Sequence, residues 1–319
     1  MGARARTEFP VTPMTEDEPL VLGSTRLRFL ETPGHTPESV CILVDDLEKD
    51  GGRPQAVLTG DTLFIGDVGR PDLFSAADLS AEELAGQPAA PAYFALDAQP
   101  NRQERPILED SLARSLRPLS LVELLAAQKE GAKILDVRDP HDYCRKHLQG
   151  SMNIGLGGKY ATWAGSLLDP KEPLVILAES GREREAALRL GRIGFDIVLG
   201  YLAGGPAVLT APEAPTATLE RIDGNELQQR MQAGEPPLLL DVRAAAEHAA
   251  WRMPGSLNVP LNNLEERMAE LPQDRHMVVS CLGGYRSTIA CSMLAARGYD
   301  HLTDLAGGIR AWPGPTESD

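Results

Sequence analysis

Several features are missing from this 319-residue sequence, and each absence excludes a class of protein. No apolar run approaches the roughly 18 residues that a membrane-spanning helix needs. The first residues, MGARARTEFPVTPMTEDEP, lack the apolar stretch of a secretory signal. Positive charge is also scarce, and the formal net charge of -15 would repel a phosphate backbone. We therefore expect a soluble cytoplasmic protein with neither a nucleic-acid nor a membrane partner.

Cysteine is equally sparse. The four cysteines, Cys41, Cys144, Cys281 and Cys291, are scattered without the close pairs typical of metal sites. A chain of this length can bury a sizeable core without disulfides. We therefore expect reduced thiols, as is usual in a cytoplasm.

An internal repeat is the strongest signal that the sequence does contain. Segments of the first copy recur in the same order about 105 residues later: ILDVRDPHDYCRKHLQGSMNI with LLDVRAAAEHAAWRMPGSLNV, RIGFD with ARGYD, and YLAGG with DLAGG. Such a period is too long for a solenoid, so each copy predicts a domain of its own.

Both copies show the same alternation of helices and apolar strands. A helical pattern comes first, then a strand ending in Asp-Val-Arg, and later a second strand followed by a turn and a helix. Continuous apolar strands alternating with helices predict an α/β fold with parallel sheets covered by helices. We place the copies at residues 118–210 and 221–319, joined by a linker at 211–220.

The second copy places one thiol at the end of an apolar strand, in VVSCLGGYRSTIACSML. Ligands of open α/β sheets bind beyond the carboxyl ends of the strands. Gly283 and Gly284 permit a tight turn, a helix is expected to begin near Ser287, and Arg286 adds a positive charge. Surroundings of this kind favour a thiolate at Cys281, which is the nucleophilic form of cysteine. The competing interpretation is a buried structural cysteine.

With these motifs, both copies resemble rhodanese sulfurtransferase domains. The pattern Cys-x-x-Gly-x-Arg is met by Cys281, Gly284 and Arg286, and the DVR, GSLNVP and LAGGIRAW segments match other landmarks of that family. The resemblance implies that Cys281 takes sulfur from thiosulfate or a persulfide and passes it to a thiol or cyanide. Arg286 would orient the donor, and Leu282, Gly283, Gly284, Tyr285 and Ser287 would bind it. We expect Asp241 and Arg243 to brace the loop and not to react. Related phosphatases hold Cys and Arg one residue further apart, so the spacing favours sulfur transfer.

The first copy lacks the nucleophile. Leu177 or Ala178 aligns with Cys281, depending on the gap, and Arg182 is expected opposite Arg286. Nearby glutamates would disfavour a thiolate or an anionic donor. We expect this copy to be inactive and to support the second, although a ligand-binding role stays open.

The N-terminal part carries a different resemblance. The segments RLRFLETPG and SVCILVDD alternate like the strands of a hairpin, and QAVLTGDTLF is typical of a buried strand that ends at an aspartate. The segments ETPGHTPESVCILVDD and VLTGDTLFIGDVGRPDLF resemble the metallo-β-lactamase fold, and within it the persulfide dioxygenases. The resemblance implies that His35 and Asp61 are ligands of an iron ion, in the facial triad of non-haem iron oxygenases. The third ligand is missing, because no histidine precedes His35. We expect a partial α/β/β/α segment at residues 1–85, shortened relative to that family, and a connection at 86–117.

Three functions are consistent with this sequence. The first is a sulfurtransferase that needs no cofactor and takes a small sulfane-sulfur donor and a thiol acceptor. The second is a degenerate fusion that acts as a scaffold. The third is an iron-dependent persulfide dioxygenase completed by a partner chain. The oligomeric state stays open, and a homo-oligomer is one of the alternatives.

Overall fold

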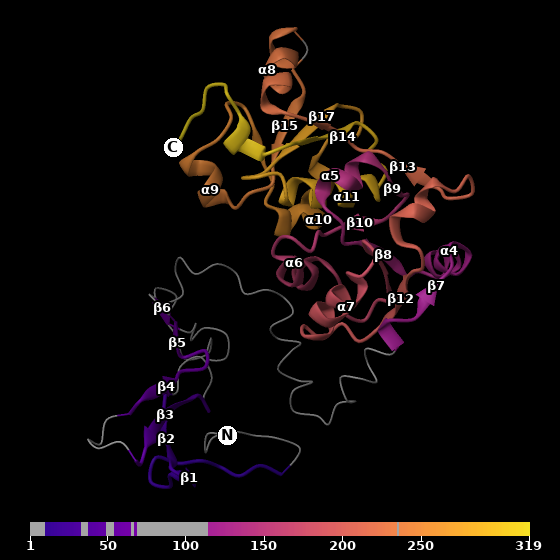
Figure 1. Cartoon of the computed structure of the whole chain (residues 1–319). Coiled ribbons are helices and arrows are strands. Elements are labelled where there is room, and N and C mark those ends of the chain that lie inside the picture. Colours follow the sequence, from indigo (N-terminus) through magenta and orange to yellow (C-terminus); the bar gives the residue numbers. More distant parts are fainter. Residues whose placement is uncertain (1–9, 33–37, 49–53, 65–66, 69–113, 235) are drawn as a thin grey trace. The chain divides into compact units, whose positions relative to one another are not determined.

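The chain divides into two units, Met1–Arg105 and Pro106–Asp319 (Figure 1). The computed structural model describes residues 10–32, 38–48, 54–64, 67–68, 114–234 and 236–319. In this part of the chain no helix is long and apolar enough to cross a membrane.

The first unit contains an antiparallel sheet of four strands. The strands are β1 (Leu20–Leu22), β2 (Thr25–Glu31), β3 (Val40–Asp46) and β4 (Ala56–Leu58), and they lie in this order. β2 and β3 pair along their whole length, which confirms the predicted hairpin. The sequence also predicts a buried strand before Asp61, and this is wrong, because β4 is an exposed edge strand. Two short strands, β5 (Leu63–Phe64) and β6 (Asp67–Val68), form an antiparallel pair.

The second unit contains two parallel sheets of five strands each. The first sheet has the order β10-β8-β11-β12-β7 and the second the order β14-β18-β17-β15-β16. Read from β7 and from β14, the two orders are the same, as the internal repeat predicts. The strands of the first sheet are β7 (Pro118–Leu119), β8 (Lys133–Asp136), β10 (Met152–Asn153), β11 (Leu174–Leu177) and β12 (Val198–Leu202). Those of the second are β14 (Glu220–Ile222), β15 (Leu238–Asp241), β16 (Leu257–Asn258), β17 (Met277–Ser280) and β18 (Leu302–Leu305).

Helices lie between these strands, as in other covered parallel sheets. The first copy has α4 (Leu121–Lys129), α5 (Pro140–Arg145), α6 (Tyr160–Leu167), α7 (Glu183–Gly191) and the 3-10 helix η3 (Gly205–Thr210). The second has α8 (Gly224–Gln232), α9 (Ala245–Ala250), α10 (Leu264–Arg267), α11 (Arg286–Ala295) and the 3-10 helices η4 (Leu261–Asn263), η5 (Met268–Glu270) and η6 (Gly308–Ala311). α4 begins with a capping box, in which Ser120 Oγ accepts from the Glu123 N–H and Glu123 accepts from the Ser120 N–H.

The segment between the copies also pairs. β13 (Thr216–Ala217) runs antiparallel to β9 (His147–Leu148), a short strand of the first copy. The predicted linker therefore contributes a strand of its own, and the chain then enters β14 directly.

The two copies share one hydrophobic core. Alternate residues of a strand face opposite sides of a sheet, so Val175 packs in a cluster of the first copy and Val278 in a cluster of the second. Their neighbours Leu174, Ile176 and Val279 belong to a third cluster that contains residues of both copies. One face of each sheet is thus covered in part by the other copy.

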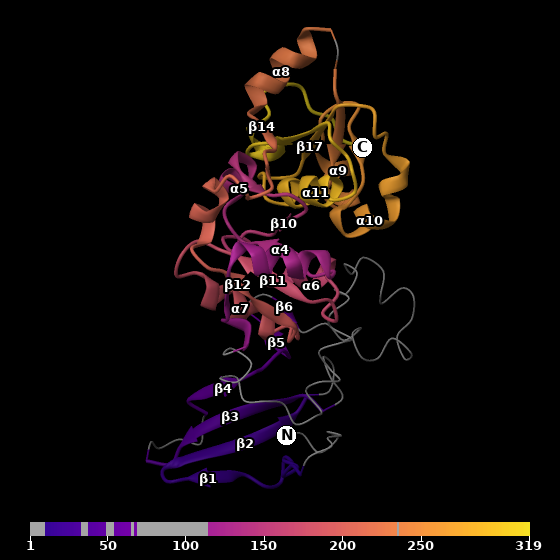
Figure 2. The ribbon, with the colours of Figure 1, turned by 90° about the vertical axis from the view of Figure 1, so that its right-hand side faces the viewer.

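Helix α11 makes the closest join between the copies. Figure 2 shows it lying next to β10 of the first copy. Ser292 Oγ accepts a hydrogen bond of 3.1 Å from the Asn153 N–H at the edge of the first sheet. The helix that follows Cys281 is therefore held by both copies.

Truncating a residue of the shared core should destabilise the protein strongly. Ile176 is fully buried there, so Ile176→Ala should lower the free energy of unfolding by about 2–5 kcal/mol through lost burial and the cavity left behind. Urea denaturation would measure this loss. Val122→Ala is the matched control, because Val122 is 74% exposed and its truncation should change stability by about 0.5 kcal/mol or less. Equal effects of the two variants would contradict the shared core.

Candidate functional site

Cys281 lies at the carboxyl edge of the second sheet. It follows β17, the central strand, directly. Its side chain is buried, with 1% of the residue exposed. The thiol thus occupies the position where parallel sheets bind their ligands, and burial excludes most water from it.

The turn after Cys281 brings a backbone donor to the sulfur. The Gly284 N–H donates to Cys281 Sγ over 3.1 Å. Gly284 has φ of +86°, which other residues rarely adopt, and a Cβ there would lie 2.9 Å from the Gly307 nitrogen. Gly283 has space around it and no such backbone angle. Of the two glycines that the sequence singled out, Gly284 is the one that the turn requires.

The second Gly-Gly pair of this copy fixes the turn from the other side. A Cβ on Gly308 would approach the Cys281 carbonyl oxygen to 2.3 Å. The N–H of Ile309 donates to that carbonyl over 2.8 Å, and the N–H of Arg310 donates to the carbonyl of Leu282 over 3.3 Å. The Ala-Gly-Gly segment therefore packs directly against the Cys281 turn and helps to hold its shape.

Helix α11 points its N-terminus at the same place. It begins at Arg286, one residue before the predicted start. The Cys281 thiol donates to Ser287 Oγ, 3.6 Å away. The positive end of the helix dipole therefore lies at the sulfur, where it stabilises negative charge. The structure thus brings Cys281, Gly284 and Ser287 together as predicted.

The side chains of two other predicted loop residues make their contacts away from the sulfur. Leu282 packs against the hydrophobic cluster of the second copy that contains Val278. The Tyr285 hydroxyl donates to the Gly155 carbonyl of the first copy over 2.6 Å. Their side chains therefore make structural contacts on either side of the turn.

Arg286 is paired with a residue that sequence reasoning missed. Its Nη1 and Nη2 donate to the two carboxylate oxygens of Glu247 over 2.7 and 2.8 Å. Hydrogen bonding to Arg286 lowers the pKa of Glu247, and Glu247 in turn raises the pKa of Arg286. The positive charge expected to orient a donor is thus balanced in this structure. No short sequence pattern predicts this pair, because α9 and the Cys281 loop are distant in the sequence and come together only in the folded protein.

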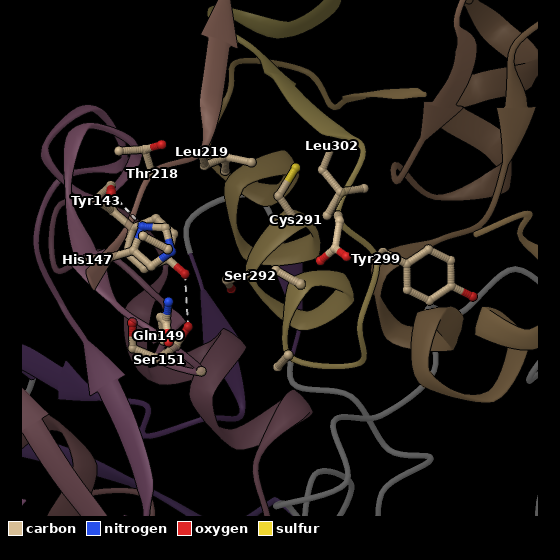
Figure 3. A pocket seen from close by; sticks show the side chains of 15 residues that line it. Tyr143, His147, Gln149, Ser151, Thr218, Leu219, Cys291, Ser292, Tyr299 and Leu302 are labelled. Atoms are coloured by element: carbon tan, nitrogen blue, oxygen red, sulfur yellow. Dashed lines mark hydrogen bonds between the residues drawn. The ribbon is translucent and has the colours of Figure 1, made fainter. Parts of the chain in front are cut away.

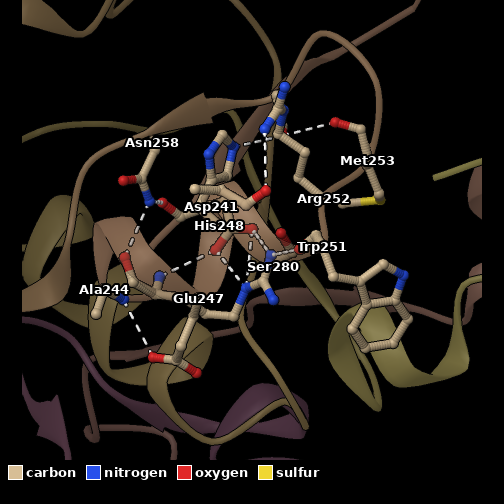
Figure 4. Close-up of polar contacts among 12 residues, drawn as sticks. Asp241, Ala244, Glu247, His248, Trp251, Arg252, Met253, Asn258 and Ser280 are labelled. Atoms are coloured by element: carbon tan, nitrogen blue, oxygen red, sulfur yellow. Dashed lines mark hydrogen bonds and ion pairs between the residues drawn. The ribbon is translucent and has the colours of Figure 1, made fainter. Parts of the chain in front are cut away.

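Asp241, at the end of β15 (Figure 4), forms a buried ion pair with Arg243. Arg243 Nη2 lies 2.6 Å from Asp241 Oδ2 and also donates to the Trp251 carbonyl. Asn258 donates to the carbonyls of both residues. The first copy repeats the arrangement with Asp136, Arg138 and the Lys146 carbonyl. These charges are paired and buried within the fold, where they hold the segments that follow β8 and β15.

A second charged pair lies behind the Cys281 turn. Arg221 Nε is 3.3 Å from Asp304 Oδ2, and Arg221 Nη2 lies 3.2 Å from the position of a Cβ on Gly284. Burial raises the pKa of Asp304 to about 6. Among the described residues, no hydrogen bond of regular geometry reaches either oxygen of this carboxylate. A charged residue inside the buried strand LTDL is the signal that sequence reasoning overlooked.

The strand register of the first copy shows which of its residues correspond to those of the Cys281 site. Asp136 pairs with Leu177 as Asp241 pairs with Ser280, so Ala178 occupies the position of Cys281. Gly181 has φ of +87°, as Gly284 has +86°. It follows that Arg182 corresponds to Tyr285 and Glu183 to Arg286. The predicted match of Arg182 with Arg286 is therefore wrong, and the first copy has lost both the thiol and the cation.

Two cavities lie in the second unit near these loops. One of about 370 Å³ is lined by Arg138, Glu179 and Arg182 of the first copy together with Gly284 and Tyr285. The other, of about 310 Å³, lies between the copies (Figure 3). Tyr143 and His147 line it from the first copy, and Cys291 and Leu302 from the second.

The remaining thiols of the second unit are suited to structural roles. Burial raises the pKa of Cys144 to about 12 and that of Cys291 well above its ordinary value. Both are buried within the unit, and buried thiols with a raised pKa are typical of structural cysteines.

Of the two predicted iron ligands, His35 lies outside the described residues. Asp61 lies in an exposed turn after β4. No group of three or more His, Cys, Asp or Glu residues suited to a metal occurs in the part of the chain that the structure describes. Iron binding thus stays a prediction from the sequence.

Comparison with known proteins bears on the second unit above all. A family model described as a rhodanese-like domain matches residues 120–207 and 223–314. A sulfurtransferase from Allochromatium vinosum is 40% identical over 94 residues, which are 30% of this chain and 88% of that protein. An adenylyltransferase and sulfurtransferase from Drosophila persimilis is 35% identical over 107 residues, covering 31% of this chain and only 24% of that longer protein. A metallo-beta-lactamase structure from Staphylococcus aureus covers 61% of this chain and 71% of that one, with 21% identity and a TM-score of 0.49.

The Glu247–Arg286 pair should stabilise the fold in a pH-dependent way. Because Arg286 lowers the pKa of Glu247 in the folded state, the pair contributes stability above the unfolded Glu pKa of about 4.3 and loses it as pH falls through the lower folded value. Glu247→Gln should therefore cost stability at pH 7 and cost little near pH 3. Urea denaturation of both proteins at each pH measures the difference. Glu265→Gln is the control, since its pair with Arg297 is exposed and contributes little. An equal cost of Glu247→Gln at both pH values would contradict the pairing.

Proposed function

Because the chain belongs to the rhodanese-like domain family, we propose that it is a sulfurtransferase that carries sulfane sulfur as a persulfide on Cys281. The observation that carries this proposal is the Gly284 N–H aimed at Cys281 Sγ, at the N-terminus of α11. A fixed backbone donor and a helix dipole stabilise the anionic sulfur before and after each transfer. The sulfurtransferase from Allochromatium vinosum supports the same class of reaction.

The reaction has two displacement steps. The Cys281 thiolate attacks the outer sulfur of thiosulfate, so that a new S–S bond forms, the old one breaks and sulfite leaves with the electron pair. With a hydropersulfide donor, the leaving group is the donor thiolate. An acceptor thiolate or cyanide then attacks the outer sulfur of the Cys281 persulfide, and Cys281 leaves again as a thiolate. No metal or redox cofactor takes part in either step, since each sulfur transfer is balanced by its leaving group.

We propose the following roles for the neighbouring residues. Gly284 and Ser287 contact the sulfur and stabilise its charge, and residues 282–287 as a whole form the donor-binding loop. Arg286 orients an anionic donor, although it shares its charge with Glu247. Because Cys281 is 1% exposed, a donor reaches it only when side chains at the loop move. The Arg286–Glu247 pair is partly exposed and is suited to such a movement.

We also propose roles for the first copy and for the N-terminal segment. The first copy, with Ala178 and Glu183 in place of the thiol and the cation, is an inactive support. The N-terminal segment is a relative of the persulfide dioxygenases that are fused to rhodanese domains, and it takes part in iron chemistry only if a partner chain completes the site of His35 and Asp61. The whole acts in the cytoplasm on small sulfur donors.

Mass spectrometry of the intact protein tests the central step. After mixing with thiosulfate or a low-molecular-weight persulfide, the wild type should gain one sulfur atom and lose it again to cyanide. Cys281→Ser should gain none. Cys144→Ala, which removes another buried thiol, should load like the wild type. No gain with either donor would reject the sulfurtransferase and favour the scaffold.

The choice of donor should respond to Glu247. Its carboxylate repels a dianion more than a hydropersulfide, and at the partly exposed edge of the site a unit charge about 4 Å away is worth about 1 kcal/mol. Glu247→Gln should thus raise kcat/KM for thiosulfate about fivefold and change the value for a hydropersulfide less. Glu265→Gln, at the exposed pair with Arg297, should leave both values unchanged. A fall in the thiosulfate value would show that Glu247 serves to position Arg286 and does not screen the donor.

A further inference from the structure

The Tyr285 side chain connects the catalytic loop to the first copy. Tyr285 stands between Gly284, whose N–H contacts the sulfur, and Arg286, where α11 begins. Its hydroxyl donates to the Gly155 carbonyl over 2.6 Å, and Tyr285 is partly buried. Burial raises the pKa of its hydroxyl, which therefore stays protonated and remains a donor.

A glycine segment of the first copy, residues 155–158, receives the tyrosine ring. A Cβ on Gly158 would lie 2.5 Å from two carbon atoms of that ring, and a Cβ on Gly155 would lie 3.5 Å from one of the same two atoms. Gly157 has no atom within 4 Å of such a Cβ. We call residues 155–158 the glycine seat. At position 158 any side chain would displace the ring, whereas at position 157 there is room.

The seat is held rigidly by the first copy itself. Arg189 Nη1 donates to the Leu156 carbonyl over 2.8 Å, and its Nη2 donates to the Gly158 carbonyl over 3.4 Å. Its guanidinium also lies over the buried ring of Tyr160, 5.1 Å from the centroid. Arg189 belongs to α7, the helix that corresponds to α11. The helix next to the lost nucleophile of the first copy thus supports the loop of the second.

We propose that Tyr285 is a positioning residue and that the glycine seat sets the geometry of the Cys281 loop. This inference rests on the proposed function and adds a specific task for the inactive copy. The Ser292–Asn153 contact fixes the middle of α11, and the tyrosine fixes its beginning. A shift of the ring moves Gly284 and Arg286 together, because they are its chain neighbours. Misplacing a reacting group by about 1 Å costs up to 100-fold in rate.

Two matched glycine variants test the proposal. Gly158→Ala should displace the ring and lower kcat for sulfur transfer by roughly 10-fold to 100-fold, with a smaller change in KM. Gly157→Ala, with an added methyl group in open space, should keep the wild-type rate. Tyr285→Phe keeps the ring and loses one hydrogen bond, so its effect should be smaller than that of Gly158→Ala.

A double variant separates positioning from a general loss of folding. In Gly158→Ala/Tyr285→Ser no ring remains to collide with the new methyl group. Its rate should therefore equal that of Tyr285→Ser alone, and the two changes should be non-additive. Additive losses, or a loss in Gly158→Ala that follows the fraction of unfolded protein in urea, would overturn the proposal.

Alkylation of Cys281 by iodoacetamide provides a readout that needs no sulfur transfer. Its pH profile reports how well the Gly284 N–H and α11 stabilise the thiolate. Gly158→Ala should move this profile to higher pH, while Gly157→Ala should not. If the wild type fails to load sulfur but the profile still shifts, the proposed function fails and the positioning role survives. An unchanged profile and unchanged kcat in Gly158→Ala would reject the positioning role alone.

Discussion

A parallel sheet has to be covered on both faces, and in this protein each copy covers part of the other. The central strands β11 and β17 are apolar along their length and fully buried. Their inner residues lie in a core that belongs to both copies. Helix α11 contributes to this core and at the same time begins at the sulfur of Cys281. The position of Cys281 therefore depends on the contact between the copies, and the first copy contributes to it without a thiol of its own at that place.

The two copies show how the same turn can keep its shape and lose its chemistry. Gly181 and Gly284 adopt nearly the same backbone conformation, and the Asp-Arg brace is present twice. At the corresponding positions of the first copy, Ala178 takes the place of Cys281 and Glu183 that of Arg286. The backbone of the turn packs in the same way in both copies, while the side chains at its ends differ.

Much of this arrangement can be predicted from the sequence. The repeat predicts two similar sheets, because the Asp-Val-Arg and Ala-Gly-Gly segments recur in order, and the strand before Cys281 predicts a ligand site at its carboxyl edge. The ion pair between Asp241 and Arg243 joins two residues that lie close together in the sequence. Contacts between residues that are far apart in the sequence could not be predicted in this way. The pairing of Arg286 with Glu247 and the seating of Tyr285 on Gly155 depend on how elements far apart in sequence pack, and no short pattern encodes them. The register of the first copy also required strand pairing, which corrected Arg182 to the position of Tyr285.

The shared core has a consequence for how the chain is made. Synthesis from the N-terminus releases the first copy before β17 and α11, which follow it in the sequence. Until then, residues such as Leu135 and Ile154 lack the part of their core that the second copy supplies. Domains usually fold as they leave the ribosome, but here the first copy exposes an apolar face until the second copy covers it. A ribosome that stops early therefore releases a product with the surface that chaperones and proteases recognise.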